Sequence, residues 1–332
     1  MVNKEGIASL MLEANKYLRI RLSGSFLRAT LLGCICLLPS VAAHGMEKQV
    51  AKRDILTANP GEALIASYDF VWKGILVGRS NSRLQLAGNG YDIQADFETR
   101  GPLRLFMKGK TDVQSTGRLT AAGLPQPDRF LSDGIWGRKN YTTELVYGAD
   151  GLLASSRIDW PKKELEKDAR EQVPAALQTG PDPLSSLISF MKAPWLQALD
   201  HKASVQIFDG RSVYVQTLEC TPAMLPLDGP KRLLYSGMAQ ECVVSFAMKA
   251  GFRVETEKEK KRRLKKEAKK QRKKANKKPK DNRIRVWFAT LEGSDMMMPV
   301  QARFKTGWGT IKMYLATFDA PPKPSGGAGA RP

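Results

Sequence analysis

Hydrophobic and polar residues alternate along most of the chain between residues 63 and 319. In YDIQADFE (91–98), Tyr91, Ile93 and Phe97 alternate with charged or amide side chains, and ASYDFVW (66–72) repeats the pattern. A period of two places such residues on one face of a strand, which is typical of half-buried antiparallel sheets. Strands are predicted at 66–72, 75–86, 91–98, 110–120, 127–135, 140–148, 152–158, 203–208, 211–219, 232–249, 284–292, 298–306 and 309–318.

Turn-forming residues separate these predicted strands. Examples are Gly88-Asn89-Gly90 and Asp209-Gly210, which favour tight hairpin connections. No strand–helix–strand spacing interrupts the series. The sequence therefore predicts a mainly β protein with a large curved antiparallel sheet or incomplete barrel.

One stretch, DPLSSLISFMKA (182–193), has helical periodicity instead. Asp182 suits an N-cap and Pro183 suits the first helical position. The positions Leu184, Leu187, Ile188 and Met191 follow at spacings that form an amphipathic face. We expect a single amphipathic helix with the sheet packed around it, preceded by a surface connection at 161–181.

The first 43 residues have the features of a secretory signal peptide. A basic leader precedes the apolar stretch ATLLGCICLLPSVAA (29–43), which is shorter than the roughly 20 residues that span a bilayer. Cleavage is predicted after Ala43. An alternative is lipoprotein processing at LLGC, with Cys34 as the lipidated residue, but this would leave an apolar segment on the mature side.

The remaining chain divides into four predicted parts. Residues 44–62 form a flexible lead-in, 63–319 a single all-β domain, 253–283 a basic disordered insertion within that domain, and 320–332 a disordered tail. No later apolar stretch has the length of a membrane span, so no transmembrane segment is expected after the signal peptide.

Two of the four cysteines, Cys220 and Cys242, lie in the predicted mature chain. Exported proteins meet an oxidising environment in which disulfides persist. We therefore predict a disulfide between them, with two buried free thiols as the alternative.

The net charge of +20 comes largely from one segment, because residues 255–283 hold sixteen Lys or Arg against five Asp or Glu. Such a run is expected to be solvated and disordered. Export excludes the usual nucleic-acid partner, whereas anionic lipid head groups, acidic envelope glycans or an acidic protein could attract it. The predicted contacts with an anionic surface are Lys260, Lys261, Arg262, Arg263, Lys265, Lys266, Lys269, Lys270, Arg272, Lys273 and Lys274.

Residues suited to catalysis or metal binding are sparse. His44 lies at the predicted cleavage junction, and His201 is interpreted as a surface residue. No HExxH, GxSxG or P-loop spacing occurs, and no Cys/His cluster suits zinc. Asp92 and Asp96 belong to the polar face of a strand, and the run Met296-Met297-Met298 is interpreted as a loop entering a strand rather than a copper site. We expect no catalytic residue, metal or cofactor.

Several short motifs resemble a known family. These are YDFVWKGILVGRS (68–80), GLPQPDRF (123–130), DPLSSL (182–187), FDGRSVY (208–214) and VWFATLEGSDMMMPVQARF (286–304), with a cysteine near 242. They resemble the domain-of-unknown-function family 3108 of exported bacterial proteins. The resemblance implies a periplasmic location and a curved sheet wrapping a helix, similar to lipoprotein-carrier folds. It implies no catalytic residues, and the basic insertion departs from the family pattern.

These observations lead to a functional hypothesis of a non-enzymatic periplasmic binding or carrier module. Its ligand would be apolar or lipidic, such as an acyl chain or a lipidated protein. The alternatives are a structural scaffold of envelope assembly with a fully packed core, and an unrecognised hydrolase. The candidate ligand-lining residues are Tyr68, Phe70, Trp72, Tyr91, Ile93, Phe97, Leu184, Leu187, Ile188 and Met191.

Overall fold

The computed structural model describes residues 63–192, 201–227, 234–255, 257, 259–262, 264–265, 283–306 and 309–321. The predicted signal peptide, lead-in and most of the C-terminal tail lie outside these residues. The strands are β1 (Ala63–Trp72), β2 (Ile75–Ala87), β3 (Gly90–Thr99), β4 (Gly109–Leu119), β5 (Pro125–Trp136), β6 (Lys139–Tyr147), β7 (Leu153–Asp159), β8 (Lys202–Phe208), β9 (Val213–Leu227), β10 (Gly237–Ala250), β11 (Ile284–Thr290), β12 (Met297–Thr306) and β13 (Gly309–Asp319).

All of these strands belong to one antiparallel sheet of 13 strands. Their order is β7-β6-β5-β4-β3-β2-β1-β13-β12-β11-β10-β9-β8, so β7 and β8 are the two edges and the sheet is not closed. The first and last strands lie side by side, with Ile65 opposite Asp319. The prediction of a mainly β protein with a large antiparallel sheet is confirmed.

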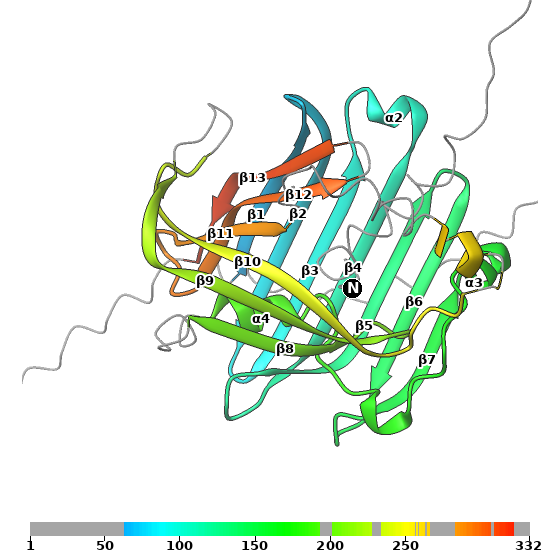
Figure 1. Cartoon of the computed structure of the whole chain (residues 1–332). Helices are drawn as coiled ribbons and strands as arrows, with labels where there is room; N and C mark the ends of the chain where they lie inside the picture. The colour runs from blue at the N-terminus through cyan, green and yellow to red at the C-terminus, as the bar shows by residue number, and fades with distance from the viewer. Residues whose placement is uncertain are drawn as a thin grey trace, which may run out of the picture.

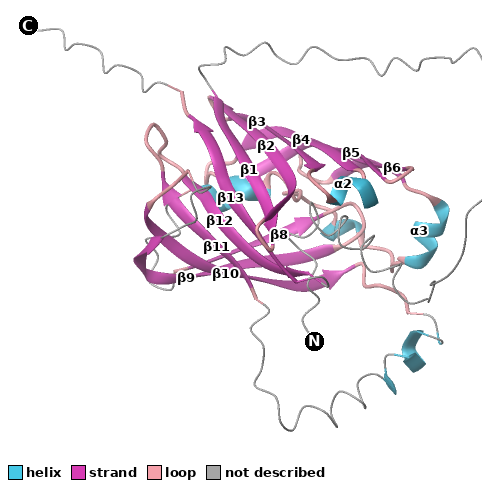
Figure 2. Ribbon diagram, turned by 90° about the horizontal axis from the view of Figure 1, so that it is seen from above, coloured by secondary structure: helices cyan, strands magenta, loops and turns pink. Residues whose placement is uncertain are grey.

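The sheet bends into two layers. Figure 1 shows β8, β9 and β10 crossing over β3–β6, and the view from above in Figure 2 shows the two layers joined through β1 and β13. Because the right-handed twist accumulates from strand to strand, a sheet of this length curls and can cover its own apolar face.

The prediction of a single amphipathic helix is not confirmed. The predicted segment contains α4 (Ser186–Met191), which has six residues and buries serines as well as apolar side chains. It contacts β5 on one layer and β8 and β12 on the other, so its polar positions have no solvent to face. Further short helices are α2 (Leu103–Phe106), α3 (Lys162–Lys167) and the 3-10 turn η2 (Ala175–Leu177).

Every predicted strand is present, and most boundaries agree within about two residues. The largest difference is β9, which was predicted to end at residue 219 and continues to Leu227. Its extension holds Pro222 and Pro226 and a run of exposed residues, so it lacks the alternation on which the prediction depended.

One hydrophobic core occupies the space between the layers and includes α4. Phe97 on β3 stacks on Trp136 on β5 and meets Phe70 on β1 edge-on, with ring centroids 6.0 and 5.3 Å apart. Glycines on the intervening strands leave room for these rings. A Cβ at Gly109 would lie 2.3 Å from the Trp136 ring, and one at Gly78 would lie 2.7 Å from the Phe97 ring.

The outer face of β1–β3 is polar and cross-linked. Arg79 pairs with Asp69 at 2.8 Å, and the Asn81 side-chain amide donates to Asp96 at 3.0 Å. Asp96 thus belongs to a solvent-side network, as the alternation predicted.

The connection between β7 and α4 is partly buried, which corrects the expectation of a surface segment at 161–181. Val173 joins the core, and Glu164 is buried beside Lys139, whose Nζ lies 2.6 Å from its carboxylate. This segment covers the gap between the edge strands, since Leu153 donates to Gln178 and Phe208 donates to Pro181 through backbone hydrogen bonds.

Candidate functional site

The predicted ligand-lining residues come together in the structure. Seven of them are buried in the core, and the other three pack against it from partly buried positions. The buried ones are Tyr68, Phe70, Tyr91, Ile93, Leu184, Ile188 and Met191, and the partly buried ones are Trp72, Phe97 and Leu187. The strands and the segment around α4 therefore contribute side chains to one apolar interior.

A carboxylate lies inside this apolar interior. Asp182, which precedes α4, is fully buried. Its Oδ1 accepts hydrogen bonds from the backbone N–H groups of Leu184 and Ser185 at 2.8 and 2.9 Å. Its Oδ2 accepts from the hydroxyls of Ser115 on β4 and of Ser185, at 2.6 and 2.7 Å. These four hydrogen bonds offset part of the desolvation cost of burying a carboxylate.

The surroundings of Asp182 influence its ionisation in opposite directions. Burial raises the pKa of the Asp182 carboxyl, because desolvation disfavours the charged form. The hydrogen bonds from Ser115, Ser185 and Leu184 lower it. Desolvation is the larger effect, so the pKa of the Asp182 carboxyl is raised overall.

Three buried tyrosines, drawn from both layers, are influenced by the negative charge of this carboxylate. They are Tyr91 on β3, Tyr147 on β6 and Tyr214 on β9. Burial raises the pKa of each phenol, and the negative charge of Asp182 raises each pKa further. Tyr91 Oη also lies 3.4 Å from Ser115 Oγ, so it belongs to the hydrogen-bonded group around Asp182.

Other polar groups in this interior have no partner. Among the described residues, none forms a hydrogen bond with Tyr147 Oη, Tyr214 Oη, Ser189 Oγ or Gln216 Nε2, although all four atoms are buried. Ser189 lies on α4 and Gln216 is the next inward-facing residue after Tyr214 on β9. Native interiors rarely leave several buried donors unsatisfied, so these groups call for a polar occupant, either a ligand or ordered water.

We define the Asp182 cluster as Asp182, Ser115, Ser185, Tyr91, Tyr147 and Tyr214, and Ser189 and Gln216 are further polar groups of the same interior. It combines apolar walls with hydrogen-bonding groups, which is the usual composition of a small-molecule site. Of the two histidines considered for catalysis, His44 lies outside the described residues. His201 lies directly before β8 and is only half-buried.

No metal site is found in the described part of the chain, where no group of three or more His, Cys, Asp or Glu residues could hold an ion. Met296, Met297 and Met298 are buried in the hydrophobic core. Met297 already begins β12, so these thioethers pack the core from a strand end rather than from a loop.

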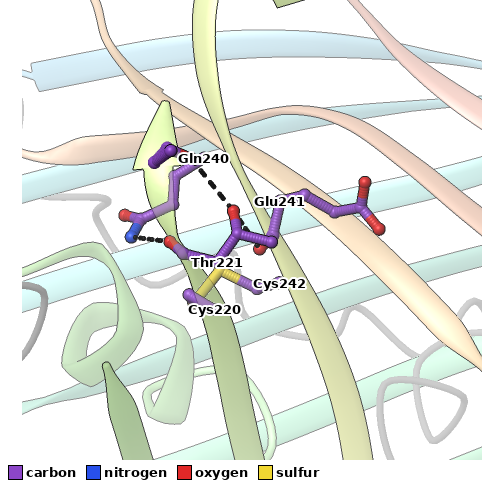
Figure 3. Close-up of a disulfide and its surroundings, with 6 residues drawn as sticks. Cys220, Thr221, Gln240, Glu241 and Cys242 are labelled. Atoms are coloured by element: carbon purple, nitrogen blue, oxygen red, sulfur yellow. Dashed lines mark hydrogen bonds between the residues drawn. A yellow bond between two sulfur atoms is a disulfide. The ribbon is translucent and has the colours of Figure 1, made fainter. Parts of the chain in front are cut away.

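The predicted disulfide is present. Cys220 on β9 and Cys242 on β10 are directly opposite each other, with a Cα–Cα distance of 3.9 Å. Figure 3 shows the bond beside two hydrogen bonds between the same strands, from Gln240 Nε2 to the Thr221 carbonyl at 2.8 Å and from Thr221 Oγ1 to the Glu241 carbonyl at 3.4 Å. Both hydrogen bonds lie on one side of the disulfide, and on its other side the strand pairing continues with Val243 opposite Glu219.

Ordered structure continues past residue 253, the predicted start of the basic insertion. Arg170 and Arg211 each lie 3.0 Å from Oδ2 of Asp168, and Arg253 lies 3.9 Å from its Oδ1. The Arg211 guanidinium also stacks on Trp160 at 4.7 Å. This arginine cluster fixes the start of the insertion against the β7–α4 connection.

Only part of the predicted anionic-surface contact is described. Residues 257, 259–262 and 264–265 are helical, and the described cations among them are exposed. These cations are Lys260, Lys261, Arg262 and Lys265, whereas Arg263, Lys266, Lys269, Lys270, Arg272, Lys273 and Lys274 lie outside the described residues.

Sequence reasoning missed the polar centre of the interior. It assigned Asp182 to a helix cap, and the carboxylate does bond the N–H groups at the start of α4. The available signal was strand parity, because Tyr147 and Tyr214 occupy inward positions of predicted strands. Strand parity predicts only that these side chains point into the interior, and it does not show whether their hydroxyls have hydrogen-bond partners.

Comparison with known proteins identifies the chain at the family level. No curated protein matches it. One solved structure, the "Beta-barrel-like Protein of Domain of Unknown Function DUF1849 from Brucella abortus", is similar with 14% identity and a TM-score of 0.35 over 77% of this chain and 97% of that chain. Within the described residues, none of the helices has the length and apolar character needed to cross a bilayer. The family described as "Protein of unknown function (DUF3108)" matches residues 67–316, and the chain belongs to this family.

Proposed function

We propose that the protein is a non-enzymatic binding or carrier module of the cell envelope whose ligand is held at the Asp182 cluster. The ligand class is amphipathic, with an apolar chain and a head group that carries hydrogen-bond donors and acceptors. The observation that carries this proposal is the set of buried, unpartnered side chains, Tyr147, Tyr214, Ser189 and Gln216, inside an aromatic and aliphatic interior.

The energetic argument concerns these four groups. Each buried polar atom without a partner costs about 1–3 kcal/mol relative to a satisfied one. A ligand head group that bonds several of them recovers this energy, while its apolar chain gains about 25 cal/mol per Å² of buried apolar surface. Ligand binding would therefore explain why the protein keeps four buried polar groups that destabilise its ligand-free form.

The open sheet supports a carrier rather than a permanent cofactor site. The edge strands β7 and β8 are not paired with each other, and the segment after β7 covers the gap between them. A ligand can enter when this segment moves, without breaking any strand pairing in the sheet.

A structural scaffold is the second candidate. It is favoured by the continuous contact of the predicted lining residues with the rest of the core. In that case ordered waters would satisfy the Asp182 cluster, and no ligand would be needed.

The location in the envelope is part of the proposal. It is supported by the signal-peptide features of residues 1–43 and by the Cys220–Cys242 disulfide, which is typical of oxidising compartments. Cell fractionation tests it, and full-length protein in the cytosolic fraction with its leader uncut would contradict it.

Lipid extraction of natively purified protein, followed by mass spectrometry, tests the proposed function directly. We expect a reproducible amphipathic ligand in the wild-type extract. The Tyr147→Phe/Tyr214→Phe double variant keeps the shape of both rings and removes only the unpartnered hydroxyls, so it should retain about tenfold less of this ligand.

Tyr235→Phe is the matched control, because its hydroxyl donates to the Met238 carbonyl in an exposed position. It should retain wild-type amounts of ligand. An empty wild-type protein, or equal retention by the double variant, would favour the scaffold instead.

A further inference from the structure

Two large apolar side chains project into solvent at one end of the sheet. Leu105 and Phe106 in α2, which connects β3 to β4, are each 85% exposed, more than any other large hydrophobic side chain in the described part of the chain. Figure 1 shows α2 beyond the ends of β3 and β4. Ile75 and Ile135 are also exposed at this end of the sheet.

The backbone around α2 is fixed and internally satisfied. Arg104 donates to the Gly101 carbonyl, Leu105 to Pro102 and Met107 to Leu103, at 2.9–3.2 Å. Gly101 has φ +58°, and a Cβ at this position would lie 2.4 Å from the Leu76 carbonyl oxygen. Three N–H groups of the turn are thus bonded within it, which lowers the number of hydrogen bonds that the turn would lose on leaving water.

The loop is attached to the fold on both sides. Arg100 donates to the Val77 carbonyl of β2 at 3.0 Å, and Gly137 donates to the Lys108 carbonyl at 2.7 Å. Leu103 packs against the core, so only the tip of the turn is exposed. The exposure of Leu105 and Phe106 is therefore a fixed property of the fold.

Cations flank this apolar tip. Arg104 and Lys108 are exposed, and Arg138 follows in the neighbouring β5–β6 turn. None of these three has an ion-pair partner among the described residues, whereas Arg100 and Lys110 pair with Glu98 and Asp112. An exposed apolar tip with positive charges that have no ion-pair partner on its own turn and on the neighbouring turn has the composition of an interfacial membrane contact.

We propose that α2 inserts Leu105 and Phe106 into the interfacial region of an anionic lipid bilayer while Arg104, Lys108 and Arg138 contact the head groups. This surface is separate from the Asp182 cluster, so the inference does not depend on the proposed function. If both hold, it places the carrier at the surface with which it exchanges its ligand.

A bilayer fits these features better than a protein partner. Stable protein interfaces bury roughly 800 Å² on each partner and present broad, complementary surfaces. Here two side chains project from a narrow turn, which suits penetration between lipid head groups. The positive charges of Arg104, Lys108 and Arg138 complement the negative surface of such a bilayer.

Co-sedimentation with vesicles tests the proposal, using the protein as the cell produces it. Vesicles of phosphatidylglycerol and phosphatidylethanolamine provide the anionic surface, and phosphatidylcholine vesicles provide the neutral one. We expect binding to the anionic vesicles that weakens in salt but does not vanish. Leu105→Ser/Phe106→Ser should reduce partitioning at least about tenfold at both salt concentrations, because the lost apolar burial is not screened.

Two further variants separate the contributions. Arg104→Gln/Lys108→Gln should weaken binding at low salt and match the wild type at high salt. Leu124→Ser removes an exposed leucine from the β4–β5 turn at the opposite end of the sheet and should bind like the wild type. Deletion of 256–280 measures the contribution of the basic insertion on the same vesicles.

Lipid-specific fluorescence quenching reports insertion itself. Brominated lipids should quench the added tryptophan of Phe106→Trp, and they should leave that of Leu124→Trp unaffected. Wild-type protein that does not bind anionic vesicles, or full binding by Leu105→Ser/Phe106→Ser, would overturn the proposal. Melting curves of each variant confirm that the fold is retained.

Discussion

Ser115 on β4 donates a 2.6 Å hydrogen bond to the carboxylate of Asp182, which lies 67 residues further along the chain. Both side chains are fully buried. This bond fixes the start of α4 against one layer of the sheet, while α4 itself also contacts β8 and β12 of the other layer. The relative position of the two layers therefore depends in part on a single hydroxyl–carboxylate contact.

Ser115→Ala should lower the free energy of unfolding by about 1.5–3 kcal/mol, because a buried carboxylate loses one of its four donors. Urea denaturation followed by tryptophan fluorescence measures this change. Ser155→Ala on the edge strand β7, where the serine is exposed, is the control and should differ from the wild type by less than about 0.5 kcal/mol. Equal stabilities for the two variants would show that the Ser115 contact is dispensable.

Gly109→Ala should lower the free energy of unfolding by about 1–3 kcal/mol through overpacking, because its Cβ would lie 2.3 Å from the Trp136 ring. In the matched change Gly148→Ala the close contact is with Asp150 Oδ1, at 2.8 Å, and this oxygen makes only an exposed hydrogen bond with the Leu152 N–H, so the effect should be smaller. Thermal melts of both variants provide the comparison. A Gly109→Ala protein as stable as the wild type would contradict the close approach.

The free energy of unfolding should fall at alkaline pH because the protein buries several tyrosines. Burial raises the pKa of Tyr68, Tyr91, Tyr147 and Tyr214 above the ordinary value of about 10. A raised folded pKa contributes stability that is complete below about pH 10 and is lost as pH rises above it, because only the unfolded chain then releases these protons.

Tyr147→Phe/Tyr214→Phe should reduce this loss by up to about 2.7 kcal/mol per pH unit above pH 10, about 1.4 for each phenol removed. Urea denaturation at several pH values between 8 and 12 measures the slope. At pH 8, where phenols are protonated in both states, the ligand-free double variant should be more stable than the ligand-free wild type, because it no longer buries two hydroxyls without partners. A slope identical to that of the wild type would contradict the buried placement of these two hydroxyls.

Removing the disulfide with Cys220→Ala/Cys242→Ala should lower the free energy of unfolding by about 3 kcal/mol, since the bond closes a loop across a sequence separation of 22. A reductant should produce a similar loss in the wild type and no further loss in the double variant. If the reductant destabilises both proteins equally, another reducible bond is responsible.

The basic insertion should act as an electrostatic tether. The described cations Lys260, Lys261 and Arg262 are exposed, and each charge near an anionic bilayer contributes about 1 kcal/mol. Deleting 256–280 should weaken binding to anionic vesicles at low salt while leaving the melting temperature within a few degrees of the wild type. Unchanged vesicle binding after the deletion would refute the tether.

The sheet could be predicted from the sequence because its determinant is local. Alternation on β3 placed Tyr91 and Ile93 inward, and the structure buries both. The extension of β9 to Leu227 could not be predicted, because prolines and exposed residues remove the alternation while pairing with β10 still holds the backbone. The length of such a strand depends on hydrogen bonding to the adjacent strand and not on its own sequence pattern.

The candidate site was less predictable for a related reason. The sequence around Asp182 is that of a helix cap, and its carboxylate does accept hydrogen bonds from N–H groups at the start of α4. Its bond to Ser115 joins segments far apart in the chain, which a local pattern does not predict. The exposure of Leu105 and Phe106 likewise depends on how the β3–β4 turn projects from the sheet. Periodicity reports which side of an element is apolar, and it contains no information on which groups meet across the fold.

Because β1 lies beside β13, the chain could be circularly permuted without changing the order of strands in the sheet. Within the thirteen described strands, every pairing other than β1 with β13 joins neighbours in the chain. Linking Asp319 to Ala63 and opening the backbone between Met191 and Lys202 would convert the order into one uninterrupted up-and-down meander from β8 to β7. The described fold is, in this sense, a circular permutation of a simpler ribbon, with its first and last strands paired in the middle of the sheet.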